Sequence, residues 1–155
     1  MYVSRHEEEV RWMERAIDLS TMCPPTDRAF SVGAVIVDAN GGELSAGYSR
    51  ESCPREHAEE AALAKLPRND PRLAGATIYS TLEPCSRRSA DRTPCAQRVF
   101  AARIPRVVIA WREPSVFVEE CVGVEQLRAA GVIVLELPEL SAAARTVNRH
   151  LLRDA

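Results

Sequence analysis

The spacing of hydrophobic residues changes several times along the chain, and these changes predict alternating helices and strands. Val10, Met13 and Ile17 recur at helical spacing among charged residues, which predicts an amphipathic helix that ends before Pro24. Runs rich in β-branched residues predict strands at 30–38, 43–48, 76–82, 106–111 and 132–137. The intervening segments predict further helices at 55–66, 93–103, 123–130 and 140–152.

The order of these elements indicates the fold class. Asn40, Gly41 and Gly42 form a turn signal that joins the first two strands in a hairpin. The alternation of strands and helices that follows favours parallel crossovers, with helices packed on the faces of one sheet. We therefore expect an α/β fold: a three-layer α-β-α sandwich around a five-stranded mixed sheet. A length of 155 residues fits one domain, so we expect residues 1–155 to form a single domain.

Charge and composition argue against several classes of partner. The formal net charge is −2, whereas proteins that coat nucleic acid are normally basic. The chain has no apolar run of about 18 residues for a membrane span, and its charged N-terminus does not resemble a signal peptide. We therefore predict a cytoplasmic protein whose partners are neither nucleic acids nor membranes.

The cysteines of a cytoplasmic protein are better explained as metal ligands or buried thiols than as disulfides. The chain has five of them, and this odd number agrees with that interpretation. Cys23, Cys53 and Cys121 have no ligand-like spacing, so we expect them to be structural.

The remaining two cysteines form a candidate Zn²⁺ site with one histidine: His57, Cys85 and Cys95. One imidazole and two thiolates are typical ligands, and they leave the fourth tetrahedral position for water. His57 and Cys95 fall in the first turn of predicted helices, where the partial positive charge favours a thiolate. A His-x-Glu motif followed by Pro-Cys and a second cysteine is typical of zinc nucleobase deaminases. Their cysteines are usually separated by two residues, and here nine residues intervene.

Such chemistry needs a carboxylate that moves protons between the attacking water, a ring nitrogen and the departing amine. Helical periodicity favours Glu60, because residues three apart share a face with His57 better than residues two apart. The deaminase motif favours Glu59, and we take Glu59 as the catalytic residue. Two alternatives stay open: ordinary structural roles for the histidine and both cysteines, or a closed structural zinc site. The fourth ligand of a closed site would be His6, His150 or Cys53.

From about Met13 to Leu137 the sequence resembles the cytidine-deaminase-like superfamily. The segment TLEPCSRRSADRTPC (residues 81–95) is similar to the deaminase domain of the bifunctional riboflavin-biosynthesis enzyme, whose motif reads TLEPCS, a short basic loop and TPPC. The resemblance implies Zn²⁺ as the cofactor and a small-molecule aminopyrimidine as the substrate. It also implies a homodimer or homotetramer.

Taken residue by residue, the resemblance implies roles for single side chains. His57, Cys85 and Cys95 match the zinc ligands, and Glu59 matches the proton shuttle. The predicted substrate-binding residues are Phe30, Ser31, Arg50, Glu51, Arg92 and Glu113.

These six substrate-binding residues come from two branches of the superfamily. Arg92 and Glu113 match a basic and an acidic residue of the riboflavin-type enzymes. Phe30 replaces part of their Asn-Pro pair and resembles cytidine deaminases, whereas Arg50 replaces their histidine. Glu51 lies where cytidine deaminases use a glutamate on the ribose.

These features predict a zinc-dependent hydrolytic deaminase that releases ammonia from a free aminopyrimidine nucleoside or nucleotide. A riboflavin-pathway substrate is favoured, and cytidine, deoxycytidylate or cytosine is the alternative. An alternative of another class is a structural zinc module without turnover. We expect no reductase domain to follow the deaminase domain. Arg87, Arg88 and Arg92 follow Cys85 in one loop, where guanidinium groups suit a substrate phosphate unless the loop is merely solvated.

Overall fold

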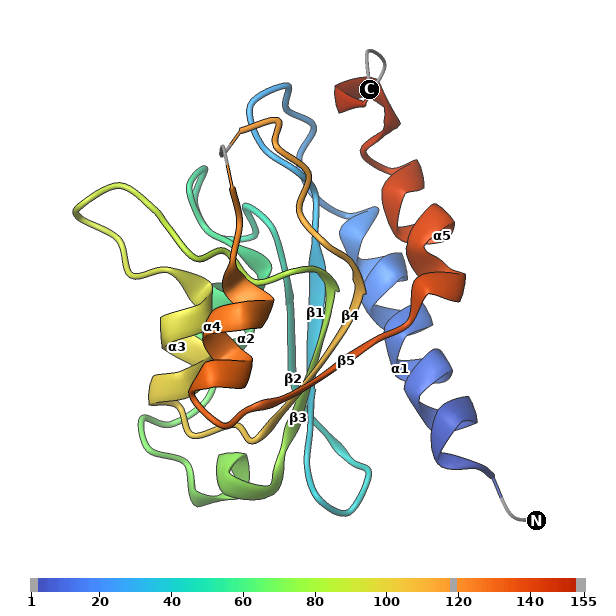
Figure 1. Cartoon of the computed structure of the whole chain (residues 1–155), viewed down its shortest axis with the longest axis vertical. Helices are drawn as coiled ribbons and strands as arrows, with labels where there is room; N and C mark the ends of the chain where they lie inside the picture. The colour runs from blue at the N-terminus through green and yellow to red at the C-terminus, as the bar shows by residue number, and fades with distance from the viewer. Residues whose placement is uncertain (1–2, 118–119, 153–155) are drawn as a thin grey trace.

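The computed structural model describes residues 3–117 and 120–152, which fold around one five-stranded sheet (Figure 1). The strands are β1 (Gly33–Val37), β2 (Glu43–Tyr48), β3 (Thr77–Leu82), β4 (Arg106–Trp111) and β5 (Ile133–Glu136). Their order in the sheet is β2-β1-β3-β4-β5. β1 pairs antiparallel with β2 and β3, whereas β3, β4 and β5 are parallel neighbours. This mixed sheet confirms the predicted fold class.

Helices cover both faces of the sheet, which gives three layers (Figure 1). On one face lie α1 (Arg5–Ser20) and α5 (Ser141–Thr146). On the other face lie α2 (Ala58–Ala64), α3 (Cys95–Ala101) and α4 (Gly123–Ala129). Short 3₁₀ turns occur at Pro71–Gly75, Pro138–Leu140 and Arg149–Leu151. Because helices cover both faces, β1 and β4 are buried along their whole length.

Across the described ranges, none of the helices combines the length and apolar character needed to cross a membrane.

α1 shows how local sequence and packing combine. The Ser4 hydroxyl accepts the N–H of Glu7 at 3.1 Å, and the Glu7 carboxylate accepts the N–H of Ser4 at 3.0 Å, which forms a capping box. Met13 and Ala16 are fully buried against the sheet. A β-carbon on Gly33 would lie 1.8 Å from the carbonyl oxygen of Ala16, so glycine is required where α1 approaches β1.

The helices that carry the candidate ligands begin later than predicted. α2 was expected from residue 55 but begins at Ala58, because His57 has the extended backbone of an N-cap residue (φ −90°, ψ 159°). α3 was expected to begin with Thr93 as the cap, and Pro94 occupies that position instead. Both differences move the ligands to the very start of their helices.

The C-terminal helix and the first strand are both shorter than predicted, and one contact explains both. The helix expected over 140–152 ends as α5 at Thr146, and the side chain of Asn148 bonds to the backbone of Ser31. The strand expected from residue 30 begins at Gly33, because the amide and carbonyl of Ser31 pair with that side chain rather than with another strand.

Candidate metal centre and active site

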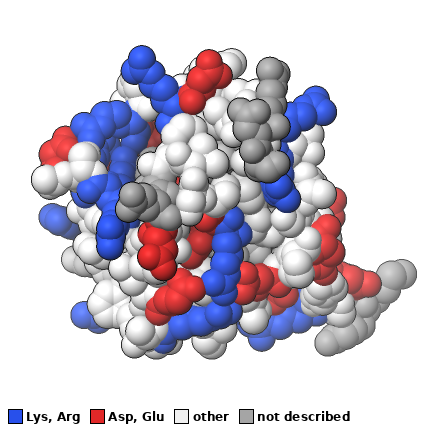
Figure 2. Space-filling model, turned by 45° about the horizontal axis from the view of Figure 1, so that its top comes forward, with Lys and Arg blue, Asp and Glu red and all other residues white. Residues whose placement is uncertain are grey.

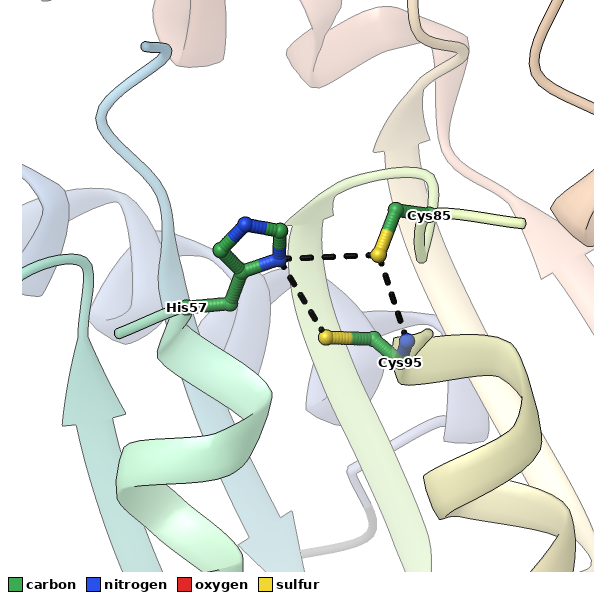
Figure 3. Close-up of side chains that lie close together, drawn as sticks. All are labelled: His57, Cys85 and Cys95. Atoms are coloured by element: carbon green, nitrogen blue, oxygen red, sulfur yellow. Dashed lines mark hydrogen bonds between the residues drawn. The ribbon is translucent and has the colours of Figure 1, made fainter. Parts of the chain in front are cut away.

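Three elements bring the predicted metal ligands to one point. Cys85 follows shortly after the end of β3, His57 is the N-cap of α2, and Cys95 is the first residue of α3. Figure 3 shows both sulfur atoms facing the imidazole ring of His57. The three ligand atoms lie within 4.8 Å of one another, and no other such group occurs in the described parts of the chain.

The spacing of these atoms fits zinc. Nδ1 of His57 lies 3.5 Å from Sγ of Cys85 and 3.4 Å from Sγ of Cys95. With Zn–N near 2.0 Å and Zn–S near 2.3 Å, nitrogen and sulfur ligands of a tetrahedral ion are about 3.5 Å apart. The backbone N–H of Cys95 also lies 3.2 Å from Sγ of Cys85, where it stabilises a thiolate. The residues present can therefore hold Zn²⁺ with little rearrangement.

The two thiols and the imidazole influence one another's protonation. A hydrogen bond from Cys95 lowers the pKa of Cys85 to about 4, against the effect of burial. The same hydrogen bond and burial raise the pKa of Cys95. Burial lowers the pKa of His57, but contact with Cys85 more than compensates and leaves this pKa above its ordinary value. Zinc needs two thiolates and a neutral imidazole, so metal binding releases protons here.

The ligand group faces an open space. His57 and Cys85 line a cavity of about 970 Å³, as a catalytic zinc site requires. The candidates for a fourth protein ligand do not complete the group: His6 and His150 make other contacts, and Cys53 lies on the cavity wall. Within the described residues, the site therefore has three protein ligands and one open side.

The two adjacent glutamates have different surroundings. Glu59 is only 4% exposed, lines the cavity, and has its pKa raised to about 7 by burial. Glu60 instead accepts the backbone N–H of His57 at 3.0 Å and faces a cluster of arginines. Helical periodicity favoured Glu60 on the assumption that His57 lies within a regular helix. His57 is instead an N-cap residue with an extended backbone, so the spacing rule does not apply to it.

Glu60 binds two arginines of the loop between the cysteines. Arg88, whose side chain is 7% exposed, contacts one carboxylate oxygen, and Arg92 contacts the other at 3.3 Å. Arg98 of α3 joins them at 3.2 Å. Arg92 therefore lies outside the cavity lining, although we predicted that it binds substrate. Arg87 is exposed and lines the cavity, and its side chain has no hydrogen bond or ion pair with the described residues.

Four of the other predicted substrate-binding residues line the cavity: Phe30, Arg50, Glu51 and Glu113. Burial raises the pKa of Glu113 to about 7, so this carboxyl group can gain or lose a proton near neutral pH. Glu51 forms a 2.7 Å ion pair with Lys65, which orients its carboxylate.

Ser31 lies outside the cavity lining, whereas Arg50 lines the cavity and donates to the Ser31 hydroxyl. Arg50 has a left-handed backbone conformation, with φ at 61°. Its guanidinium group donates to the carbonyls of Pro24 at 3.0 Å and Phe30 at 3.1 Å, and to the Ser31 hydroxyl at 2.7 Å. Burial lowers the pKa of Arg50. The contacts of these two residues thus hold loop 24–31 in place.

Sequence reasoning missed Glu83, a buried residue that organises the cavity. Its carboxylate is 3% exposed and accepts the backbone N–H groups of Glu113 at 3.0 Å and Val124 at 2.9 Å. The sequence did contain a signal, because Glu83 belongs to the TLEPC motif. We assigned roles to other residues of that motif but none to Glu83. Asn148, which was also missed, had no local signal in the sequence.

Fold and site together define a class of protein. A histidine, two cysteines and a buried glutamate, placed at a strand end and at two helix starts of an α/β sandwich, are the arrangement of zinc-dependent deaminase domains. The model of the family described as "Cytidine and deoxycytidylate deaminase zinc-binding region" matches residues 6–111. The chain belongs to this family, and zinc is the metal that its site takes.

Its relatives include proteins of riboflavin biosynthesis. The chain is 44% identical over 133 residues to the diaminohydroxyphosphoribosylamino-pyrimidine deaminase of Schizosaccharomyces pombe, with 84% of this chain and 32% of that protein aligned. It is 36% identical over 144 residues to the riboflavin biosynthesis protein RibD of Haemophilus influenzae, covering 92% of this chain and 36% of the relative. The solved structure of Acinetobacter baumannii RibD (form 2) matches with a TM-score of 0.81 at 29% identity, over 97% of this chain and 40% of that one. The chain thus spans about a third of the length of these curated relatives.

Proposed function

We propose that this chain is a hydrolytic deaminase that releases ammonia from the exocyclic amine of a phosphoribosylated aminopyrimidine. One observation carries the proposal: the buried carboxyl group of Glu59 lines the same cavity as the ligands His57 and Cys85. The names of the Schizosaccharomyces pombe and Haemophilus influenzae relatives support a substrate of riboflavin biosynthesis.

The reaction requires a nucleophile and a group that moves protons. Zinc bound by the three ligands supplies the first, because it lowers the pKa of water from 15.7 towards roughly 7. Glu59 accepts one proton of the attacking water and passes it to the adjacent ring nitrogen, and it then takes the proton of the hydroxyl group now on the ring carbon and delivers it to the leaving amine. The C–N bond breaks, ammonia departs, and the water oxygen becomes the carbonyl oxygen of the product. Because burial places the pKa of Glu59 at about 7, the same group can act as base and then as acid.

The cavity supports a substrate of this kind. Its volume of about 970 Å³ is large enough for a ring, a sugar and a phosphate, since small-molecule sites span roughly 300–1,000 Å³. Phe30 offers an apolar face for the ring, and Glu113 offers a carboxyl group for its polar edge. Arg87 lies on the exposed side of the cavity, where a guanidinium group suits the phosphate.

The test is ammonia release from a panel of cytosine, cytidine, deoxycytidine, dCMP, CMP, guanine and the phosphoribosyl diaminopyrimidinone. Glu59→Gln should lower kcat by at least about 10²-fold at unchanged zinc content, because general acid–base catalysis contributes on that scale. Glu125→Gln is the matched control, since Glu125 is exposed on α4 and, among the residues that the structure describes, forms an ion pair with Arg112 alone.

The outcomes separate the candidate functions. Turnover of the phosphoribosyl compound alone supports the proposal. A preference for cytidine or dCMP would instead favour the second candidate, which the position of Glu51 on the cavity wall supports. Zinc-loaded protein that releases no ammonia from any compound would contradict catalysis and favour a structural zinc module.

We also propose that the deaminase domain acts as a homodimer or homotetramer in the cytoplasm and has no nucleic-acid partner. Cys85 and Cys95 must stay reduced to bind zinc, which a reducing compartment ensures. Figure 2 shows acidic and basic side chains interspersed on one face of the molecule, unlike the basic stripe of a nucleic-acid binder. Light scattering after gel filtration tests the oligomeric state, and a monomer would contradict that part of the proposal.

A further inference from the structure

The C-terminal segment contacts the wall of the cavity through one buried amide. The side chain of Asn148 is almost fully buried, and its residue is 1% exposed. Its Oδ1 accepts the backbone N–H of Ser31 at 2.6 Å, and its Nδ2 donates to the backbone carbonyl of Ser31 at 3.0 Å. The amide thus occupies the place that a neighbouring strand would take beside Ser31, with 117 positions of sequence between the two residues.

This contact fixes a residue that faces the substrate. The N–H that Asn148 binds belongs to the peptide bond between Phe30 and Ser31. Phe30 lines the cavity and packs edge-on against Trp111 and Phe117, with ring centroids 5.5 Å and 5.0 Å apart. A shift of this peptide bond would therefore move the apolar face that the ring of the substrate contacts.

Other side chains hold the same loop 24–31 but at different atoms. His150 lies next to the carbonyl oxygen of Thr26, with Nε2 at 3.0 Å. Arg50 donates to two carbonyls and to the Ser31 hydroxyl. The backbone N–H of Ser31 is bound by Asn148, whose amide presents an acceptor and a donor on two separate atoms, one for the N–H and one for the carbonyl of Ser31.

We propose that Asn148 is a positioning residue for the reaction: it holds Phe30 in the orientation that binds the ring of the substrate. The inference rests on the proposed function, because it assumes that the ring lies against Phe30. Asn148 would then contribute to substrate binding from the C-terminal segment. This segment packs on the face of the sheet opposite the ligand-bearing helices α2 and α3 (Figure 1).

Two variants of Asn148 test the proposal in zinc-loaded protein. Asn148→Asp keeps the shape but replaces the donor with an acceptor that faces a carbonyl, and Asn148→Ala removes both groups. With the preferred substrate of the panel, each should raise KM about tenfold and leave kcat within about twofold, as expected when a binding contact worth about 1.4 kcal/mol is lost. Thr146→Val is the matched control, because the exposed Thr146 hydroxyl donates to the carbonyl of Ala142 in its own helix and makes no other hydrogen bond within the described ranges.

A second measurement does not depend on activity. Hydrogen exchange of the Ser31 amide, followed by NMR, should accelerate at least about tenfold in Asn148→Ala, and the control should leave it unchanged. If Asn148→Asp does not fold, Asn148→Ala and this measurement still decide the question.

The outcomes for Asn148 and for the proposed function can be told apart. Faster exchange with a raised KM supports the inference, whereas faster exchange with wild-type KM would overturn it and leave the deaminase proposal intact. A loss in kcat alone, or a loss of zinc, would also overturn it. Failure of the function itself would appear in wild-type protein, which would release no ammonia from the panel.

Discussion

The carboxylate of Glu83 accepts the backbone N–H of Glu113 at 3.0 Å, which joins the metal-binding motif to another residue of the cavity lining. Its second oxygen accepts the N–H of Val124, the second residue of α4, at 2.9 Å. One buried side chain therefore binds both ends of the connection between β4 and α4. Phe117, which lines the cavity, belongs to that connection.

Replacement of this carboxylate should weaken both stability and catalysis. In Glu83→Gln the amide offers one acceptor and one donor, so one of the two N–H groups loses its partner. We expect the free energy of unfolding to fall by about 1–3 kcal/mol, the usual effect of a buried polar group without a partner. kcat/KM should fall as well, because Glu113 would no longer be held. Urea denaturation and steady-state kinetics measure the two effects.

Exposed Glu125 provides the control for Glu83. Glu125→Gln should change stability by no more than about 0.5 kcal/mol, as is usual for surface substitutions. Equal effects of the two variants would show that the hydrogen bonds of Glu83 do not organise the cavity.

Glu60 should stabilise the loop between the two cysteines. Glu60→Gln would leave Arg88, Arg92 and Arg98 without their common negative charge, and Arg88 is nearly buried. Removing one partner of a buried ion pair costs about 3–5 kcal/mol, so we expect a loss of that size in zinc-loaded protein. Thermal and urea denaturation measure it.

The control for Glu60 is an exposed ion pair of the same loop. Asp91→Asn removes the partner of Arg55, but both side chains are more than half exposed, so solvent screens the pair and the expected loss is much smaller than for Glu60→Gln. A smaller loss for Glu60→Gln than for Asp91→Asn would contradict the role of Glu60.

Removal of zinc should make the thiol of Cys85 reactive. In zinc-loaded protein at pH 8, exposed Cys53 should react first with a thiol reagent. Cys121 should react slowly, because burial raises its pKa to about 12 and keeps it protonated. After chelation Cys85 should become reactive, because it lines the cavity and its pKa is lowered to about 4, whereas buried Cys95, whose pKa is raised, should react only slowly. Unchanged reactivity of Cys85, measured by mass spectrometry of the alkylated peptides, would argue against this residue as a zinc ligand.

Arg87 should discriminate between phosphorylated and unphosphorylated substrates. Arg87 and Arg88 both line the cavity, but Arg88, like Arg92, is already paired with Glu60. Arg87→Ala should raise KM for the phosphorylated substrate about tenfold, the factor that corresponds to about 1.4 kcal/mol, and leave the unphosphorylated one unaffected. Exposed Arg68, which is absent from the cavity lining, serves as the control in Arg68→Ala. An equal change for both substrates would rule out phosphate contact.

Local patterns were sufficient for the sheet and for the metal ligands. β-branched runs identified β4 and the other strands, because a strand buried on both faces has a recognisable composition. His57, Cys85 and Cys95 could be recognised from their residue types and from the helix starts and strand end that they occupy. The structure brings all three together, and the family match supports zinc as their metal.

The roles of the polar side chains around the cavity depend on the folded structure. The sequence could not show that Arg92 pairs with Glu60 or that Arg50 holds the Phe30 carbonyl, because each contact joins segments far apart in the chain. Nothing in the sequence indicated the contact between Asn148 and Ser31. Residue types alone were enough to identify the atoms that can bind zinc, since ligand chemistry is a property of the residue. The packing of loops against helices decided which charges face the substrate and which are already paired, since a hydrogen bond depends on distance and direction in space.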